Sequence, residues 1–342
     1  MYTIKDVAER AGVSVATVSR YMNGFPHISE SARRRIQQAI AELNYRPNIA
    51  ASGLVTKTTK AIGLMVLTGI SEFFSNPFFT QVLNGISHKA LSAHYDVLLS
   101  TSGSDEIEVL TNWIRGGRVD GIILLRSRLE DPAIDLVVQE RFPAVLLGRP
   151  AHNQPIDYVD NDNVDAAYQA TTHLIRLGHQ RVAFMGGGKH LVVTQDRILG
   201  YQKALREYDM PIHDAYIRTG HYKKNSGYAV CQELLRLSKP PTAIVASDDI
   251  MAIGAMQAAH DAHLRVPDEL SIVGFNDLAI SSLTIPPLTS MRIHIHELGF
   301  KAADLLLKRI AQPSLPQQVA VIRTHLVVRQ STASFISGEI KP

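Results

Sequence analysis

Charged and polar residues follow several apolar runs of this sequence, at the points where buried strands are expected to end. Arg149, Ser247, Asp248 and Asn276 each stand within two residues of the end of such a run. Guanidinium, hydroxyl, carboxylate and amide groups make the hydrogen bonds that a hydroxyl-rich ligand needs, and a site built on them rejects analogues that lack a hydroxyl. These residues predict a binding site for a small polar molecule such as a sugar.

Aromatic rings supply a second kind of contact, because they stack on the apolar face of a pyranose. We expect Phe74 and Phe79 to contact the ligand, with about half of the aromatic residues at 73–79 belonging to the core. Arg197 and Tyr222, the latter in an expected loop, complete the ligand set. Asp248 and Asp277 have an alternative role, because an Asp in front of a helix caps its N-terminus. The polar run 160–163 is interpreted as a turn between lobes.

Motifs of common enzyme chemistry are missing. Gly186–Lys189 does not fit the phosphate-loop pattern Gly-x-x-x-x-Gly-Lys-Ser/Thr, and no Gly-x-Ser-x-Gly elbow occurs. His294 and His296 alternate as in a strand without further ligands nearby, so we interpret them as structural. Cys231, the only cysteine, lies in a helical pattern and can form neither an internal disulfide nor a cysteine metal cluster. We therefore expect no enzyme activity, no metal and no cofactor.

Apolar runs alternate with helical patterns from residue 61 onward. Continuous apolar strands separated by amphipathic helices predict parallel sheets covered on both faces. About 280 residues are too many for one small sheet, and the alternation of apolar runs and helical patterns starts again near 168–185. We therefore predict two similar α/β lobes with a ligand cleft between them. A tail from Leu288, with a helix near 297–310, crosses back to complete both lobes. The expected strands are 61–67, 95–100, 121–125, 144–147, 181–185, 243–246, 270–274, 319–323 and 326–328.

The first 45 residues predict three short helices, which Thr3, Ser14 and Ser29 are placed to cap. Residues 1–60 carry nine Lys and Arg against four Asp and Glu, a net charge of +5, whereas the remainder has a net charge of −2. A basic head on a near-neutral body is typical of a protein that meets a polyanion.

Two helices joined by a tight turn at Gly12 predict a helix-turn-helix, whose second helix lies in the major groove of DNA. We expect that helix over 15–23. Val15 and Ala16 suit thymine methyl groups, and Arg20 can hold a guanine through its fork of donors. The short polar side chains of this helix suit phosphates, which position a protein without specifying sequence; they are Thr17, Ser19 and Asn23.

Five stretches resemble the lactose/galactose repressor family. Thr-Ile-Lys-Asp-Val-Ala-Glu-Arg-Ala-Gly-Val-Ser at 3–14, Thr-Val-Ser-Arg at 17–20 and Leu-Asn-Tyr-Arg-Pro-Asn at 43–48 lie in the head, and 246–255 and 271–277 lie in the core. The resemblance covers nearly the whole chain. It implies a dimeric or tetrameric repressor that binds DNA and has a core responsive to a sugar or nucleoside.

The resemblance also implies that residues 48–55 become a hinge helix on DNA, with Leu54 wedged into the minor groove. An apolar wedge of this kind unstacks a base step. Many relatives carry Arg where this chain has Ser52, and Gly53 costs about 1 kcal/mol of helix propensity relative to Ala, so we expect a hinge that folds less readily. The DNA contacts expected beyond these are Thr3, His27, Tyr45, Asn48 and Ala51.

For the effector site, the resemblance aligns Arg197, Tyr222, Ser247 and Asn276 with positions that contact inducer in relatives, where position 247 is often Asn and 276 often Asp. Within the family, the stretches 76–87, 159–163 and 186–201 resemble maltose-operon regulators of Gram-positive bacteria. We therefore expect a repressor that maltose or a short maltodextrin releases from a palindromic operator. The alternative is a family member that responds to another sugar or acts through a corepressor.

The predicted organisation is a helix-turn-helix head at 1–46, a hinge and linker at 47–60 and a two-lobed core at 61–342. Lobe 1 is expected at about 61–160 plus 291–322, and lobe 2 at about 161–290 plus 323–335. No apolar run is long enough to span a membrane, and the N-terminus has no signal-peptide core.

From these absences we expect a cytoplasmic protein without a membrane partner. Its expected partners are double-stranded operator DNA, a small sugar effector and a second copy in a homodimer, because no heptad run follows 326–328. A protein corepressor is not indicated, although some relatives use one. An enzyme and a transport-type sugar receptor are the competing classes.

Overall fold

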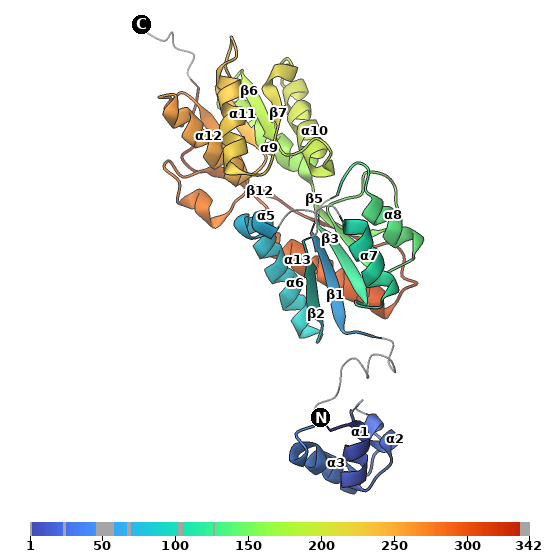
Figure 1. Cartoon of the computed structure of the whole chain (residues 1–342). Coiled ribbons are helices and arrows are strands. Elements are labelled where there is room, and N and C mark those ends of the chain that lie inside the picture. Colours follow the sequence, from blue (N-terminus) through green and yellow to red (C-terminus); the bar gives the residue numbers. More distant parts are fainter. Residues whose placement is uncertain are drawn as a thin grey trace. The chain divides into compact units, whose positions relative to one another are not determined.

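The described part of the N-terminal unit holds three helices: α1 (Ile4–Ala11), α2 (Val15–Met22) and α3 (Glu30–Glu42). The structure is a computed structural model that describes residues 2–22, 25–45, 58–66, 70–101, 105–125 and 127–335, with the side chains of 70–72 left out. The chain divides into two units, Met1–Thr59 and Lys60–Pro342, and each unit is described by itself (Figure 1).

Local hydrogen bonds explain where these helices begin. Thr3 precedes α1, and its backbone N–H donates to the Asp6 carboxylate at 2.6 Å, as in a capping box. Ser14 Oγ accepts from the Thr17 N–H at 3.1 Å at the start of α2. Gly12 ends α1 with φ +62°, a left-handed conformation that favours glycine. Val7, Ala8, Val18 and Ile36 are among the buried residues that hold the three helices together.

Two six-stranded sheets organise the larger unit (Figure 1). The first has the order β11-β5-β4-β3-β1-β2, and the second has the order β12-β10-β9-β8-β6-β7. All pairings are parallel except the pairing of β10 with β12. The strands are β1 (Ala61–Val66), β2 (Asp96–Ser100), β3 (Gly121–Leu125), β4 (Ala144–Leu147), β5 (Asp157–Asn161), β6 (Val182–Gly186), β7 (Ile217–Thr219), β8 (Ala243–Ala246), β9 (Ser271–Asn276), β10 (Thr289–Arg292), β11 (Val319–Ile322) and β12 (His325–Val327).

Helices cover both faces of each sheet, as the continuous apolar strands predict. In the first lobe, α6 and α13 pack on one face and α7 and α8 on the other; in the second, α9 and α10 lie opposite α11 and α12. The helices are α5 (Ile70–Ser75), α6 (Pro77–Ser92), α7 (Glu106–Arg115), α8 (Pro132–Gln139), α9 (Asn163–Arg176), α10 (Val192–Glu207), α11 (Lys224–Leu235), α12 (Asp249–Asp261) and α13 (Ile295–Ala311), with short 3-10 turns at Asp214–Tyr216 and Ala279–Ser282. The expected fold, a helical head and a two-lobed α/β core with parallel sheets, is confirmed.

The chain passes between the two sheets at 161–163, 292–295 and 322–325. These crossings put the carboxyl ends of the parallel strands of both sheets at the junction of the lobes, where ligands bind in open α/β sheets. Buried residues of both lobes, such as Val159 and Phe275, belong to one continuous apolar cluster.

Four local expectations differ from the structure. Strands β5 and β7 were not expected, because β5 has only two apolar residues and β7 has three residues in all. His294 and His296 flank the start of α13 rather than lying in a strand. Met291 and Arg292 belong to β10 of the second sheet, whereas the sequence placed them in lobe 1.

Candidate functional site

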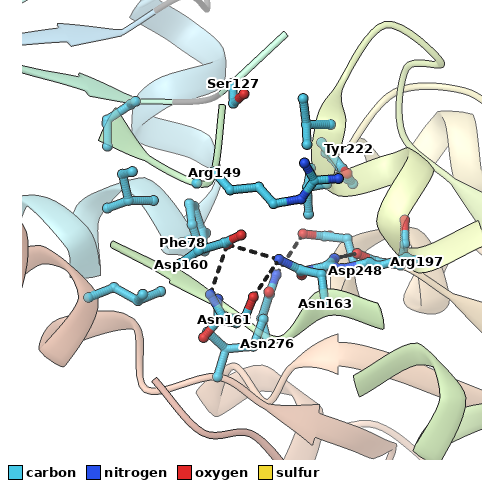
Figure 2. A pocket seen from close by; sticks show the side chains of 18 of the residues that line it. Phe78, Ser127, Arg149, Asp160, Asn161, Asn163, Arg197, Tyr222, Asp248 and Asn276 are labelled. Carbon is cyan, nitrogen blue, oxygen red and sulfur yellow. Dashed lines mark hydrogen bonds between the residues drawn. The ribbon is translucent and has the colours of Figure 1, made fainter. Parts of the chain in front are cut away.

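A pocket lies where the carboxyl ends of both sheets meet (Figure 2). It encloses about 800 Å³ including its open side. Strands β3, β4 and β5 contribute from the first lobe, and β8 and β9 from the second. Its lining residues are Asn76, Phe78, Phe79, Leu125, Ser127, Leu147, Gly148, Arg149, Asp160, Asn161, Asn163, Val192, Val193, Arg197, Tyr222, Ser247, Asp248, Asn276, Ile293 and Leu298.

Arg197 is a buried cation fixed at the pocket wall. It lies on α10, where its Nε donates to Asn163 Oδ1 at 3.0 Å and its Nη1 donates to the Ser247 carbonyl at 2.5 Å. The guanidinium also lies 4.2 Å from the centre of the Phe275 ring, a favourable cation–π distance. Burial lowers the pKa of Arg197, but arginine remains charged in proteins. The second lobe therefore presents a rigid positive group to the pocket.

Asp248 both caps a helix, as one expectation had it, and lines the pocket. Its Oδ1 accepts from the Ile250 N–H at 2.8 Å at the start of α12, and its Oδ2 accepts from Asn276 Nδ2 at 2.9 Å. Burial raises the pKa of Asp248 to about 6, and the helix N–H groups oppose this shift. Asn276 ends β9 with φ +98°, and this turn directs its amide toward Asp248.

Asp160 faces these groups from the first lobe. It lies near the end of β5, where its Oδ1 accepts from the Asn161 N–H at 2.8 Å and from Asn163 Nδ2 at 3.0 Å (Figure 2). Burial raises the pKa of Asp160 to about 7, and the nearby Asp196 carboxylate adds to this effect. The carboxyl group can therefore exchange its acceptor role for a donor role near neutral pH.

Arg149 and Asp196 form an ion pair between the lobes beside the pocket. Arg149 follows β4 and extends across the pocket (Figure 2), and its Nε and Nη2 both donate to the buried Asp196 carboxylate of α10, the Nε at 2.8 Å. Such two-point pairing fixes the orientation of the guanidinium. Backbone bonds join the lobes as well, from Val192 N–H to the Ser127 carbonyl at 3.1 Å and from Leu129 N–H to the His190 carbonyl at 2.9 Å.

Three buried polar atoms of the lining have no hydrogen-bond partner among the described residues. They are Ser127 Oγ, Asn161 Oδ1 and Ser247 Oγ. A buried polar group without a partner costs about 1–3 kcal/mol, so its occurrence in a folded protein requires an explanation such as a ligand or water. All three belong to one pocket, and they come from both lobes.

Aromatic residues line two sides of the pocket. Phe78 and Phe79 contribute from α6, and Tyr222 contributes from the loop between β7 and α11. Gly187 makes room for Tyr222, because a Cβ at Gly187 would lie 2.3 Å from Tyr222 Cζ. Phe74 is different: its side chain is 58% exposed, packs edge-on against Phe73 and is not part of the lining. The expectation that Phe74 contacts the ligand is therefore corrected.

The structure brings the other expected ligand residues together. Arg149, Arg197, Tyr222, Ser247, Asp248, Asn276 and Phe79 all line the pocket. The run 160–163 lies where the chain crosses between the lobes, as expected, and it also lines the pocket through Asp160, Asn161 and Asn163.

Six further polar or aromatic lining residues were missed: Asn76, Phe78, Ser127, Asp160, Asn161 and Asn163. Asn76 caps α6, Phe78 follows it, and Ser127 stands two residues after β3. The rule that polar residues just after an apolar strand line the site, here called the strand-end rule, would have found Ser127. Asn161 and Asn163 could be found only with knowledge of β5.

The N-terminal unit exposes one side of α2. Val15 is 41% exposed, Ala16 and Arg20 are exposed as well, and Val18 is buried in the core. This division leaves Val15, Ala16 and Arg20 accessible to base edges, as in a recognition helix. Thr17 and Ser19 are half-buried; Thr17 also shares a 2.8 Å hydrogen bond with Ser14 Oγ.

The remaining expected DNA contacts fall into two groups. Thr3 and His27 are exposed and Tyr45 is half-buried, and Thr3 also takes part in the capping box of α1. Four of the expected contacts lie outside the described residues: Asn23, Asn48, Ala51 and Leu54.

Comparison with known proteins identifies both parts of the chain. Residues 3–48 match the description "Bacterial regulatory proteins, lacI family", and residues 171–332 match a periplasmic binding protein-like domain. Catabolite control protein A of Priestia megaterium is 33% identical over 96% of this chain and 99% of its own length. The chain belongs to the lacI family of bacterial regulatory proteins. Like these relatives, the chain is a DNA-binding transcriptional regulator and not an enzyme.

Other members of the lacI family are similar over most of the chain. The HTH-type transcriptional regulator MalR of Streptococcus pneumoniae is 39% identical over 78% of this chain and 81% of its own length. A lac repressor dimer bound to operator and the anti-inducer ONPF has a TM-score of 0.85 at 29% identity, covering 97% of this chain and 99% of that one. A complex of the regulator CelR with cellobiose has a TM-score of 0.77 at 31% identity, covering 97% of this chain and all of that one.

The described part of the chain lacks two further features. No helix there has both the length and the apolarity to cross a membrane. The same part of the chain holds no group of three or more His, Cys, Asp or Glu side chains arranged to bind a metal ion.

Proposed function

We propose that this regulator is a homodimeric repressor of carbohydrate-utilisation genes, released from a palindromic operator when a glucosyl disaccharide, in the first place maltose, occupies the pocket. One observation carries the proposal: three buried polar atoms of one pocket have no hydrogen-bond partner among the described residues. We call them the orphan atoms; they are Ser127 Oγ, Asn161 Oδ1 and Ser247 Oγ. Sugar hydroxyl groups both donate and accept, so they can satisfy hydroxyl and amide oxygens together.

The surrounding groups support a sugar of this size. Arg197, Asp160 and Asp248 supply charge-assisted hydrogen bonds, while Phe78 and Phe79 offer apolar surface for a pyranose face. A relative of the same architecture forms a complex with cellobiose, which is a glucosyl disaccharide. The resemblance of 76–87, 159–163 and 186–201 to maltose-operon regulators and the 39% identity to MalR favour maltose over cellobiose.

Control of DNA binding follows from the position of the pocket between the lobes. A ligand that contacts both lobes stabilises one lobe arrangement over another by its differential affinity. Coupling of about 1–3 kcal/mol would change operator affinity about 5–150-fold. Release by the ligand makes it an inducer, and tighter binding would make it a corepressor.

Fluorescence anisotropy of the full chain on DNA from its own upstream region tests this function. The titrations use fixed salt, because phosphate contacts make affinity steeply salt-dependent, and they compare maltose, cellobiose and lactose. We expect maltose to weaken binding at least fivefold and lactose to have no effect. Weakening by cellobiose alone would transfer the proposal to a β-linked disaccharide, and no response to any of the three would refute it.

Serine variants connect the response to the pocket. Ser127→Ala and Ser247→Ala each remove one orphan hydroxyl group, so they should fold as well as the parent and require more maltose for half-maximal release. Ser281→Ala removes a buried serine outside the lining and should leave the maltose response unchanged. Equal responses of all four proteins would show that the sugar acts elsewhere.

A further inference from the structure

A second hollow adjoins the pocket on the surface of the first lobe. It encloses about 600 Å³ including its open side, and Arg149 lines both this hollow and the pocket. The loop after β4 and the segment before β11 form its walls. We call it the outer groove; the side chains that matter here are Arg149, His152, Asn153, Gln154, Tyr158 and Gln317.

The outer groove has the chemistry of a carbohydrate site. The amides of Asn153 and Gln154 and the imidazole of His152 can both donate and accept hydrogen bonds, as sugar hydroxyl groups require. Gln317 offers its Oε1 as an acceptor, because both of its N–H groups donate to backbone carbonyls. Tyr158 adds a half-buried ring with a hydroxyl group, a combination of apolar body and polar tip that suits a sugar ring. Among the described residues, Arg149 is the one charged residue in the lining of the groove, and the Asp135 carboxylate lies beside Gln154, so a neutral ligand fits the groove better than an anion.

The Arg149 side chain is fixed by hydrogen bonds and forms part of the wall of both the pocket and the outer groove. Its Nε and Nη2 donate to Asp196, and its Nη1 donates to the Pro150 carbonyl at 3.1 Å. These bonds use three of the five guanidinium N–H groups, and the other two remain for ligand atoms. Because one fixed side chain lines both hollows, the pocket and the outer groove are adjacent at Arg149.

The walls of the groove are braced before any ligand binds. Gln317 Nε2 donates to the Gln154 and Ile156 carbonyls at 3.2 and 2.7 Å, and Gln154 Nε2 donates to Asp135 at 2.8 Å. A loop that is already ordered costs less to bind than one that must be immobilised.

We propose that the outer groove is a second sugar subsite, which binds the third and later units of a gluco-oligosaccharide whose first two units occupy the pocket. The inference rests on the proposed function, since it extends the same ligand. It makes the regulator a sensor of chain length that responds to oligosaccharides at lower concentrations than to the disaccharide.

Isothermal titration calorimetry of the full chain with maltose, maltotriose and maltotetraose tests the subsite. We expect maltotriose to bind about tenfold more tightly than maltose. The double variant His152→Ala/Asn153→Ala should lose most of this gain and keep the maltose affinity of the parent, because these two side chains lie outside the pocket lining. Ala151→Trp, which places a ring in the groove, should weaken maltotriose binding and leave maltose binding unchanged.

A matched control removes the same residue types elsewhere. Asn112→Ala/His260→Ala changes two exposed positions outside both hollows and should retain the parental preference for maltotriose. Equal affinities for the three sugars in the parent, or an intact preference in His152→Ala/Asn153→Ala, would overturn the subsite while leaving the disaccharide proposal standing. No binding of any of the three sugars would refute the maltose proposal and the subsite together.

Discussion

Replacing Asp160 by Asn should stabilise the first lobe at alkaline pH and much less at acidic pH. The substitution keeps the local hydrogen bonds, because an amide oxygen can accept from the Asn161 N–H and from Asn163 Nδ2 as Oδ1 of Asp160 does. What changes is the charge, since the amide does not titrate. The difference between the two proteins therefore isolates the cost of holding a buried carboxylate.

The sign and size of the effect follow from the raised pKa. Burial raises the pKa of Asp160 from 3.8 to about 7 in the folded protein. Between these two pH values the unfolded chain has lost the proton that the folded protein still binds, so the free energy of unfolding falls as the pH rises. The slope is about 1.4 kcal/mol per pH unit, which amounts to roughly 3 kcal/mol between pH 5 and pH 8.

Urea unfolding in the absence of sugar, at pH 5 and at pH 8, measures this difference. Trp113, the only tryptophan, is buried on α7 in the same lobe as Asp160 and reports on its unfolding by fluorescence. The stability gain of Asp160→Asn over the parent should be roughly 3 kcal/mol larger at pH 8 than at pH 5. Buried carboxyl groups that do not interact with Asp160 are common to both proteins and cancel in the comparison.

A second variant serves as the charge control, and one outcome would refute the reasoning. Asp162→Asn removes an exposed carboxylate two residues away and keeps a residue type that caps helices well. If Asp160→Asn gave the same stability change at both pH values, or lowered stability at pH 8, the reasoning about the buried charge would be refuted.

Three further substitutions probe the two functional parts. Arg197→Met leaves the Asn163 and Ser247 acceptors and nearby carboxylates without their cation, so urea denaturation should show a loss of roughly 3–5 kcal/mol; a loss below 1 kcal/mol would contradict this. Gly187→Ala displaces the Tyr222 ring, so calorimetry should show at least tenfold weaker maltose binding with unchanged operator affinity, and unaltered maltose affinity would exclude a role for the ring. Arg20→Ala should weaken operator binding by about 1–3 kcal/mol and leave non-specific DNA binding almost as it was; anisotropy on operator and on scrambled DNA distinguishes this from a uniform loss, which would indicate a phosphate contact.

Local sequence signals were sufficient for much of the fold. Thr3, Ser14 and Ser29 marked the helix starts of the head, and the apolar runs located β1, β3, β4 and β8 to within a residue at each end. These features depend on neighbours along the chain, such as a hydroxyl beside a free helix N–H or a run of apolar residues between helices. For the same reason the strand-end rule found Arg149, Ser247 and Asp248.

Tertiary structure decided which of these residues share a site. Asp160 lies in a strand with few apolar residues, and its place in the pocket became visible only when β5 was paired between β4 and β11. Phe74 and Phe79 are both aromatic and close in sequence, yet only Phe79 lines the pocket; the two residues lie on different helices, α5 and α6, which the break at Asn76 separates.

The sequence by itself therefore determined the elements and the chemistry that each strand end can offer. It could not determine the pairing of Arg149 with Asp196, which lie 47 positions apart on different lobes. Contacts of this kind, the orphaned oxygens of Ser127 and Ser247 and the raised pKa of Asp160 all arise from burial between two lobes. Burial is a property of the assembled lobes, because it depends on which distant segments exclude water from a given side chain.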